Sequence, residues 1–562
     1  MTPHHTGRPP TSAQRGLVTS PHYLASGTGL DILRAGGSAV DAAIAANATL
    51  CVVYPHMAGL GGDGFWLISD GESPDGINAS GPAAATATRE YYRKLAADRD
   101  DEPADGDGHE SAGDADIPER GAAAALTVPG AVDGWRLAHE AYGTLPWDRL
   151  FEDAITYARE GAPVAPSLAR WTAADRDVLR KDERAAETFL IDGDAPEPGT
   201  SLRQPALAGS FETLATLGAR EGFYEGRVAE AFCDGLDDDS PLDTDDFADY
   251  HAEWVEPLSI DYRGYTAHTL PPNTQGIAAL QLLGLLSEFD VESWGDGSVD
   301  YYHHMAEATK VAFADRDAWV TDPTAVDLPV DRLLAADYLA ERRQLIEAES
   351  SLPAAVDPGI VPETTTPQAQ NAGGDTCFLS VVDDDGLAVS LIQSIYFDFG
   401  SGVIAGETGV IPQNRGAFFS LDPDHVNCLE PGKRTFHTLI PSMLTRDGEP
   451  RLLYGTMGGE GQPQTQAALV SRIVDFGDTV QEAIEAPRWL FGRTWGEQSK
   501  SLTLEGRVPD RVVDELARRG QPVAMARDYD ETMGHAAAIR LHENGTLEGG
   551  ADPRGDGAAL GY

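Results

Sequence analysis

The stretch GGDTCFLSVVDDDGLAVSLIQSIYF, residues 373–397, carries the clearest structural pattern in the chain. Two β-rich runs flank an Asp-Asp-Asp-Gly turn, Asp383–Gly386, which is typical of a β-hairpin. The preceding segment, about 349–372, is rich in Ser, Pro, Thr, Gln and Asn, and this composition predicts a linker. The linker therefore leads directly into a strand whose first residue is Thr376.

Thr376 is a candidate nucleophile because of this position. A threonine hydroxyl is a poor nucleophile near neutral pH and needs a base beside it. If the peptide bond before Thr376 is cut, the new α-amine, with a pKa of about 8, supplies that base on the same residue. Ser394, in the second run of the hairpin, can hydrogen-bond the threonine oxygen and orient it. The alternative is a structural threonine, because a threonine that begins a buried strand more often packs than reacts.

Two glycines downstream supply the second part of this chemistry. Gly458 and Gly459 follow the short run RLLYG, residues 451–455. Consecutive glycine amides can approach a developing oxyanion closely, and one such donor contributes about 3–4 kcal/mol to transition-state stabilisation. We therefore expect these two amides to form an oxyanion hole.

Composition limits the possible classes of protein. The 562 residues, of which 41% are hydrophobic, suffice for three or four domains or for one large multilayer unit. Lys and Arg number 41 against 91 Asp and Glu, so the net charge is −50, which disfavours nucleic-acid binding. We interpret this acidity as adaptation to a cytoplasm of molar salt, where the Debye length is about 3 Å. A secreted acidic protein is the alternative.

Other features predict a cytoplasmic protein without metal or cofactor. No apolar run approaches the roughly 18–20 residues of a membrane-spanning helix, and the N-terminus lacks a hydrophobic signal core. The adjacent His303 and His304 would point in different directions on a helix, so they do not predict a metal site. The run MAEATKVAFADRDAW, residues 305–319, predicts a helix whose charged neighbours are surface or capping groups. The acidic stretch of about 98–119 predicts a solvated surface insertion.

Several motifs, in this order along nearly the whole chain, resemble the γ-glutamyltransferase (γ-glutamyltranspeptidase) family. They include GGSAVDAAIAANATLCVVYPHMAGLGGDGFWL (36–67), GDTCFLSVVDDDG (374–386), GTMGGEGQPQ (455–464) and ADPRGDGAALGY (551–562). The resemblance implies an α+β fold, a four-layer αββα sandwich of the N-terminal-nucleophile hydrolase type. It also implies a proenzyme that cuts itself between Asp375 and Thr376. The products would be a large subunit, 1–375, and a small catalytic subunit, 376–562, intertwined in one fold.

The resemblance also implies roles for single residues. The nucleophile of the family falls on Thr376, whose α-amine acts as the base, and the supporting hydroxyl, usually a threonine, falls on Ser394. The oxyanion glycines fall on Gly458 and Gly459. The implied reaction passes through an acyl-enzyme, which water or an acceptor amine releases, and it needs no cofactor.

The substrate pocket departs from the family pattern. An arginine is replaced by Ser80, an asparagine by Tyr396, a glutamine and an acidic residue by Arg415 and Phe418, and two serines by His437 and Thr438. A substrate ammonium facing Arg415 would meet a like charge, which can cost several kcal/mol. Arg415 is therefore a candidate for binding a substrate carboxylate, with His437, Thr438 and Tyr396 beside it. Its alternative role is a structural ion pair in a very acidic protein.

The expected function is that of an autoprocessed amide hydrolase or acyltransferase, glutathione hydrolase-like, acting on glutathione or a γ-glutamyl-like amide. The alternative is a cephalosporin-acylase-like or oxamate-amidohydrolase-like enzyme acting on a different carboxylate amide. Two further hypotheses are a catalytically silent binding protein and a cysteine hydrolase that uses Cys377. Because side chains alternate along a strand, Cys377 should face away from Thr376.

Overall fold

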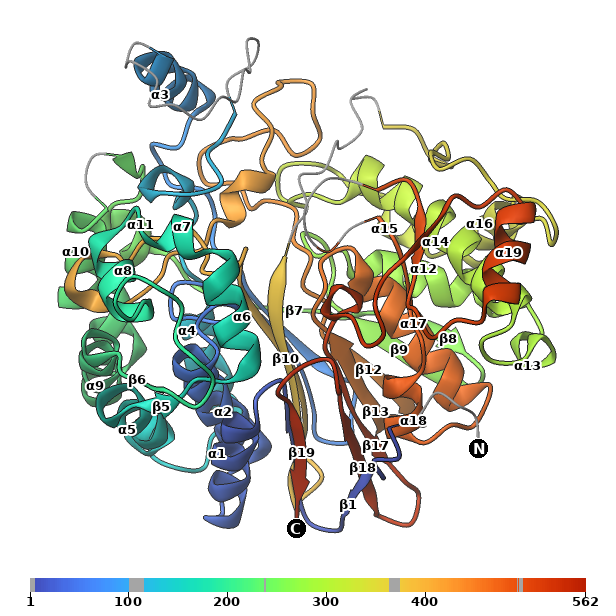
Figure 1. The fold of residues 1–562 in the computed structure, drawn as a ribbon, viewed down its shortest axis with the longest axis horizontal. Helices are drawn as coiled ribbons and strands as arrows, with labels where there is room; N and C mark the ends of the chain where they lie inside the picture. The colour runs from blue at the N-terminus through green and yellow to red at the C-terminus, as the bar shows by residue number, and fades with distance from the viewer. Residues whose placement is uncertain (1–5, 101–115, 237–238, 363–373, 493, 495–498) are drawn as a thin grey trace.

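The computed structural model describes residues 6–100, 116–236, 239–362, 374–492, 494 and 499–562. Two seven-stranded sheets lie face to face, and helices cover the outer face of each sheet (Figure 1). This arrangement confirms the predicted four-layer αββα sandwich. Each sheet buries both of its faces, which explains why most of the central strands consist almost entirely of apolar or small residues.

The first sheet contains the predicted hairpin. In order it consists of β19 (Ala558–Gly561), β2 (Leu17–Ser20), β10 (Asp375–Val382), β11 (Ala388–Tyr396), β3 (Asp63–Ser69), β4 (Asp75–Ala79) and β7 (Glu253–Val255). Strands β10 and β11 pair antiparallel on either side of the predicted turn. The Asp383 carboxylate closes this turn, because it accepts hydrogen bonds from the amides of Asp385 and Leu387.

The second sheet faces the first across an apolar core. In order it consists of β1 (Thr11–Ala13), β18 (Leu547–Ala551), β17 (Ala536–Leu541), β13 (Glu449–Thr456), β12 (Ser442–Arg446), β9 (Tyr265–Thr269) and β8 (Leu258–Tyr262). Alternate residues of both sheets fill the space between them, among them Phe378, Ile392, Met443 and Leu453. Glycines permit close approach here, since a Cβ on Gly455 would lie 2.3 Å from the ring of Phe378.

Helices pack on both outer faces. Helices α1 (Tyr23–Arg34), α2 (Ala39–Val53) and α4 (Ala131–Tyr142) contact the first sheet, and α12 (Gly276–Leu286), α17 (Gly461–Val474) and α18 (Val480–Glu485) contact the second (Figure 1). Helix α2 is buried on every side, and its N-terminus is closed by a capping box of Ser38 and Asp41. Small side chains therefore let α2 lie close to the sheet on one side and to further helices on the other.

The remaining helices and short strands complete the layers and their borders. They are α3 (Arg89–Asp100), α5 (Glu152–Glu160), α6 (Pro166–Ala174), α7 (Arg176–Leu179), α8 (Glu183–Phe189), α9 (Pro205–Ala219), α10 (Arg227–Asp234), α11 (Thr244–Asp249), α13 (Val291–Trp294), α14 (Val299–Trp319), α15 (Val330–Leu333), α16 (Ala336–Arg343), α19 (Asp510–Arg518), β5 (Ala162–Pro163), β6 (Ser201–Leu202), β14 (Trp489–Phe491), β15 (Leu502–Leu504) and β16 (Val523–Met525). Within the described ranges, no helix is long and apolar enough to cross a membrane.

The prediction for the charged residues of α14 is wrong. Lys310 and Arg316 are buried, and so are His303 and His304. The Lys310 ammonium donates hydrogen bonds to Glu307, to the Leu352 carbonyl and to two other groups. Periodicity could not reveal this, because the partners come from segments distant in sequence.

The predicted insertion and linker are only partly described. Helix α3 continues to Asp100, so the first residues of the predicted insertion, 98–100, are helical, and the insertion itself remains a prediction. Residues 101–115 lie outside the described chain. In the linker, residues 351–362 form neither helix nor strand, and residues 363–372 lie outside the described chain. The division into subunits at Asp375 remains a prediction.

Candidate active site

Three polar side chains form a row across neighbouring strands of the first sheet. Ser394 in β11 pairs with Asp63 in β3, and Thr376 lies on the other side of β11, in β10. All three share the strand parity of core residues such as Ile392 and Phe378, which face the second sheet. The row therefore faces the space between the two sheets, at the ends of the strands.

A bulge between Asp375 and Cys377 sets Thr376 apart from regular pairing. Thr376 is fully buried, and its Oγ1 makes no hydrogen bond with any described residue. Ser394 Oγ accepts hydrogen bonds from the Tyr396 amide (2.7 Å) and from Arg415 Nη2 (3.4 Å). The predicted hydrogen bond between Ser394 and Thr376 is therefore absent while the Asp375–Thr376 bond is intact, although the two residues lie on adjacent strands.

Gly458 and Gly459 form a turn directly after β13. Their φ angles are +127° and +51°, a region that favours glycine. The Gly458 carbonyl accepts hydrogen bonds from Gly461 and from Thr494 Oγ1, and the Gly459 carbonyl accepts one from Gln275 (2.9 Å). Neither glycine amide donates a hydrogen bond to a described residue. With both carbonyls held elsewhere, the two N–H groups stay available, as an oxyanion hole requires.

This glycine turn lies against the chain that enters β10. A Cβ placed on Gly374 would lie 3.6 Å from the Cα of Gly459. Gly374 precedes Thr376 by two residues, so the turn lies close to the start of β10, and the oxyanion role of the two glycines remains a prediction.

Arg415 is a buried cation without a carboxylate partner. Its guanidinium stacks on the Tyr396 ring at 4.1 Å, and Nη1 donates to Thr438 Oγ1 (3.2 Å). Burial lowers the pKa of Arg415 to about 10. Among the described residues, no carboxylate lies within 4 Å of the guanidinium, and Nε has no partner. The described part of the chain therefore offers no ion pair for this arginine, which was its alternative role.

Asp63 is a site residue that the sequence did not reveal. Its Oδ1 accepts hydrogen bonds from the amides of Gly81 and Gly130 and from Gln413, and its Oδ2 lies 3.2 Å from His437 Nε2. Burial raises the pKa of Asp63 to about 7, although these hydrogen bonds oppose the shift. In the sequence, Asp63 stands out as an acidic residue among glycines at the start of an apolar strand, and this pattern could have indicated a site residue.

His437 is neutral in this environment. Burial, together with the nearby charge of Arg415, holds the pKa of His437 well below its ordinary value. Its Nδ1 accepts a hydrogen bond from the Leu439 amide (3.4 Å), which assigns the proton to Nε2, the atom that faces Asp63.

Comparison with known proteins identifies the family of this chain. A family model described as gamma-glutamyltranspeptidase matches residues 25–562. The chain belongs to the γ-glutamyltranspeptidase family. A Bacillus subtilis relative, "Glutathione hydrolase-like YwrD proenzyme", is 45% identical over 97% of this chain and 98% of its own length. The "Oxamate amidohydrolase proenzyme" of Klebsiella pneumoniae is 44% identical over the same shares of the two chains.

A solved structure supports both the fold and the enzyme class. The cephalosporin acylase from Bacillus halodurans matches with a TM-score of 0.87 and 37% identity, over 100% of this chain and 98% of its own. As a member of the γ-glutamyltranspeptidase family, with enzymes as structural neighbours, this chain is an enzyme of the amide hydrolase and acyltransferase class.

Among the residues that depart from the family pattern, Tyr396, Phe418 and Thr438 form a cluster around Arg415. Phe418 packs on the Tyr396 ring with a centroid distance of 4.7 Å, so it helps to hold the ring under Arg415. Ser80 donates to Asn78 (2.7 Å) and lies close to Asn273, and it carries no charge to bind a carboxylate. Arg415 therefore carries the positive charge nearest to Ser394.

Cys377 lies in the apolar core beneath the helices of the first sheet, on the opposite face from the row of Thr376 and Ser394. This position confirms the predicted alternation and argues against a cysteine nucleophile. Among the described residues, no group of three or more His, Cys, Asp or Glu side chains is placed to hold a metal ion.

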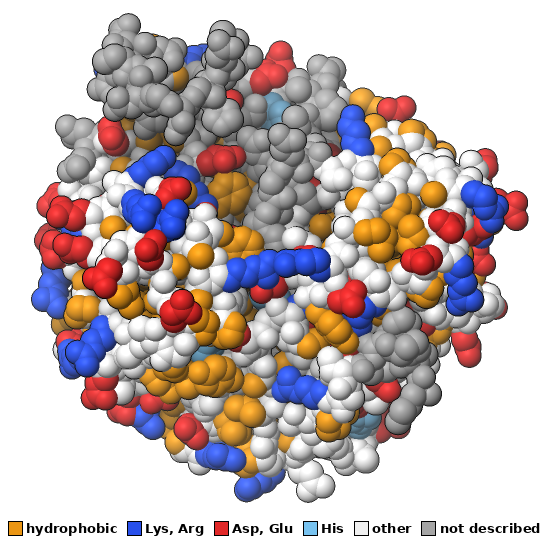
Figure 2. Space-filling model, viewed as in Figure 1, with side chains coloured by type: hydrophobic (Ala, Val, Ile, Leu, Met, Phe, Trp, Pro, Cys, Tyr) orange, Lys and Arg blue, Asp and Glu red, His pale blue; other side chains and the backbone are white. Residues whose placement is uncertain are grey.

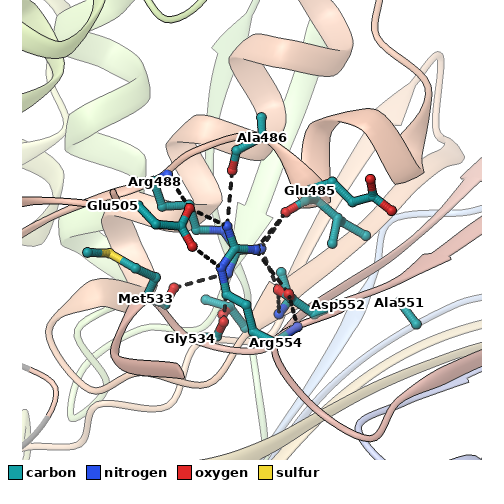
Figure 3. A network of polar contacts seen from close by, with 12 residues as sticks. Glu485, Ala486, Arg488, Glu505, Met533, Gly534, Ala551, Asp552 and Arg554 are labelled. Carbon is teal, nitrogen blue, oxygen red and sulfur yellow. Dashed lines mark hydrogen bonds and ion pairs between the residues drawn. The ribbon is translucent and has the colours of Figure 1, made fainter. Parts of the chain in front are cut away.

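A buried ionic network around Arg488 and Arg554 (Figure 3) lies next to the turn of Gly458 and Gly459. Arg488 donates to the carbonyls of Met533 (3.0 Å) and Gly534 (2.7 Å) and pairs with Asp552 (2.5 Å). Gly534 packs against this glycine turn, because a Cβ on it would lie 2.3 Å from the carbonyl oxygen of Met457. Arg488 thereby fixes the segment on which Gly458 rests.

Proposed function

We propose that this enzyme of the γ-glutamyltranspeptidase family cleaves itself before Thr376 and then hydrolyses small amides whose acyl group carries a carboxylate. The observation that carries the proposal is the buried Arg415, which lies beside Ser394 without a carboxylate partner among the described residues. The word "proenzyme" in the names of both relatives supports the cleavage step.

Cleavage begins when Thr376 Oγ1 attacks the Asp375 carbonyl carbon. The C–N bond breaks, the acyl group passes to oxygen as an ester, and the proton of the hydroxyl ends on the new amine. Water then hydrolyses the ester, which leaves a carboxyl group on Asp375 and a free amine on Thr376. The products are a large subunit, 1–375, and a small subunit, 376–562, held together by the sheet that both build.

Turnover uses the new amine as the base. The amine takes the proton from Oγ1 as the oxygen attacks the substrate amide carbon, and the amides of Gly458 and Gly459 stabilise the oxyanion. The proton then passes to the departing amine of the substrate. Water, or an acceptor amine, attacks the resulting ester and regenerates Thr376.

The position of Arg415 favours a short acyl group. Arg415 Nη2 lies 3.4 Å from Ser394 Oγ. Ser394 and Thr376 lie on adjacent strands, and adjacent strands of a sheet are about 4.8 Å apart. A carboxylate paired with Arg415 would therefore lie within a few bonds of the scissile carbonyl, as in oxamate or malonamate. The second candidate is a γ-glutamyl amide such as glutathione, which the relative named glutathione hydrolase-like supports.

A substrate panel tests the proposal. Oxamate, malonamate, glutaramate and γ-glutamyl anilide are compared by kcat/KM at a salt concentration that keeps the protein folded. We expect the two short carboxylate amides to be preferred by at least tenfold. A γ-glutamyl preference would show that the proposed role of Arg415 is wrong, even if the cleavage mechanism is right.

Denaturing gels and mass spectrometry test the cleavage separately. We expect two fragments, the smaller one beginning at Thr376, and a single inactive chain for Thr376→Ala. Uncleaved native protein with full activity would refute the N-terminal nucleophile. Thr376→Ser serves as the control, because it keeps a hydroxyl and should still be cut.

We also infer that the protein works in a cytoplasm of high salt. The net charge of −50 supports this habitat, and on the face shown in Figure 2 the acidic side chains are scattered instead of forming one patch.

A further inference from the structure

A charged pocket lies at the end of the second sheet that is remote from Gly458. It has a volume of about 350 Å³, within the range of small-molecule sites, and it is lined by residues of β12, β13, β17 and the end of α17. β13 begins at this pocket and ends at Thr456, two residues before Gly458, so at about 3.3 Å per residue the two sites are roughly 20 Å apart. The pocket is therefore distinct from the active site.

Three arginines line this pocket: Arg446, Arg451 and Arg540. Each is half-buried, and among the described residues no carboxylate lies within 4 Å of any of the three guanidiniums. Three arginines without carboxylate partners are unexpected in a chain with 91 acidic and 41 basic residues, because most surface arginines of such a protein have a carboxylate nearby. Repulsion among cations that line one pocket costs free energy, which a bound anion would offset.

The guanidinium groups are partly pre-oriented. Arg446 stacks on the Tyr265 ring at 3.8 Å, and its Nε donates to the Gly264 carbonyl (3.4 Å). Arg451 Nε is buried without a hydrogen-bond partner. Stacking holds a guanidinium plane while leaving its outer donors free, and those donors match a carboxylate in bidentate geometry.

The acidic groups near the pocket do not neutralise it. Glu543 lines the pocket but is exposed, and it forms no ion pair with the three arginines. The carboxylate of Glu548 pairs with His542 (2.7 Å) and also accepts a hydrogen bond from the Val480 amide. Glu449 and Glu548 lie opposite Arg446 and Arg540 across the strands, but within the described ranges neither forms an ion pair with these arginines.

We propose that this pocket binds a small organic polycarboxylate. Several guanidiniums suit a ligand with more than one carboxylate, and the apolar wall suits a carbon skeleton better than an inorganic anion. That wall is formed by Leu444, Leu452, Ile473 and Val474. The proposal does not depend on the proposed function, because none of these residues belongs to the active site.

Calorimetric titration with citrate tests the proposal. The background is full-length Arg415→Gln, which removes the carboxylate site proposed at Thr376. At the lowest salt that keeps the protein folded, we expect one citrate site in this background. We expect binding to weaken at least tenfold in Arg446→Gln and in Arg540→Gln, and to be unchanged in Arg518→Gln, an exposed arginine of α19.

Further measurements keep the proposal falsifiable. Val474→Glu adds a negative charge to the apolar wall and should abolish binding even if an arginine variant folds poorly, and thermal unfolding without ligand checks each variant. No saturable citrate binding, binding unaffected by the pocket variants, or inorganic phosphate binding as tightly as citrate would each overturn the proposal. If the native protein binds two citrate molecules and Arg415→Gln binds one, the lost site is the one proposed at Thr376. That result concerns the proposed function and not this pocket.

Discussion

The proposed chemistry depends on two buried side chains whose polar atoms are incompletely satisfied. Thr376 Oγ1 has no hydrogen-bond partner among the described residues, and neither has Arg415 Nε. A buried polar group without a partner costs about 1–3 kcal/mol, so such groups persist mainly where they serve a ligand or a reaction. Asp63 is the opposite case, since at least four groups satisfy its carboxylate and hold it beside His437.

Replacing Arg415 by lysine separates substrate binding from cleavage. A lysine ammonium can neither stack flat on Tyr396 nor form a bidentate pair with a carboxylate. We expect Arg415→Lys to lower kcat/KM for carboxylate amides about 100-fold, or about 2.7 kcal/mol, while self-cleavage still occurs. Initial rates and gel densitometry measure the two effects. Unchanged kcat/KM in the cleaved variant would assign Arg415 a structural role.

At the scale of elements, the local patterns were predictable and the long-range contacts were not. The hairpin follows from alternation and from the Asp383–Gly386 turn, both of which are local. The role of Asp63 depends on Gly81, Gly130 and Gln413, which only the tertiary fold brings together. The choice between the two roles of Arg415 likewise depended on which carboxylates lie within reach, and spacing along the chain does not contain that information.

The turn that contains Gly534 offers a test of the oxyanion hole. Gly534 has a φ of +83°, and a Cβ there would lie 2.3 Å from the Met457 carbonyl oxygen, next to Gly458. We expect Gly534→Ala to shift this turn and to lower kcat by 10–100-fold with little change in KM, because the oxyanion forms only in the transition state.

Gly36→Ala is the matched control for this variant. Gly36 also has a positive φ, +89°, but a Cβ there would meet nothing within 4 Å. Both substitutions carry the same kind of backbone strain, so thermal unfolding should show a loss of stability for both. If kcat for Gly534→Ala equals kcat for the control, the turn that contains Gly534 does not contribute to catalysis.

At the scale of the whole molecule, the charge of −50 opposes folding through self-repulsion. Raising the ionic strength from 0.1 M to 1 M shortens the Debye length from about 10 Å to about 3 Å. We expect the free energy of unfolding at pH 7 to rise by about 2 kcal/mol or more between 0.2 and 3 M KCl. Urea denaturation at each salt concentration measures this, and a flat dependence would contradict the inferred habitat.

Buried histidines add a dependence on pH. Burial lowers the pKa of His22 to about 3 and that of His268 to about 4. Such groups stay neutral in the folded protein, whereas they take up a proton near pH 6.5 in the unfolded chain. Their contribution to stability is therefore complete above pH 6.5 and is lost as the pH falls toward the folded-state pKa, by up to about 1.4 kcal/mol per pH unit for each histidine.

His268→Gln tests this mechanism at constant high salt. His268 Nε2 lies 2.9 Å from Thr445 Oγ1, and glutamine can keep a hydrogen bond there without titrating. We expect the variant to lose less stability than the native protein between pH 6.5 and 4.5, measured by urea denaturation. The exposed His251→Gln should leave the slope unchanged. Equal slopes for native protein and His268→Gln would mean that acid sensitivity arises from other groups, chiefly the paired carboxylates.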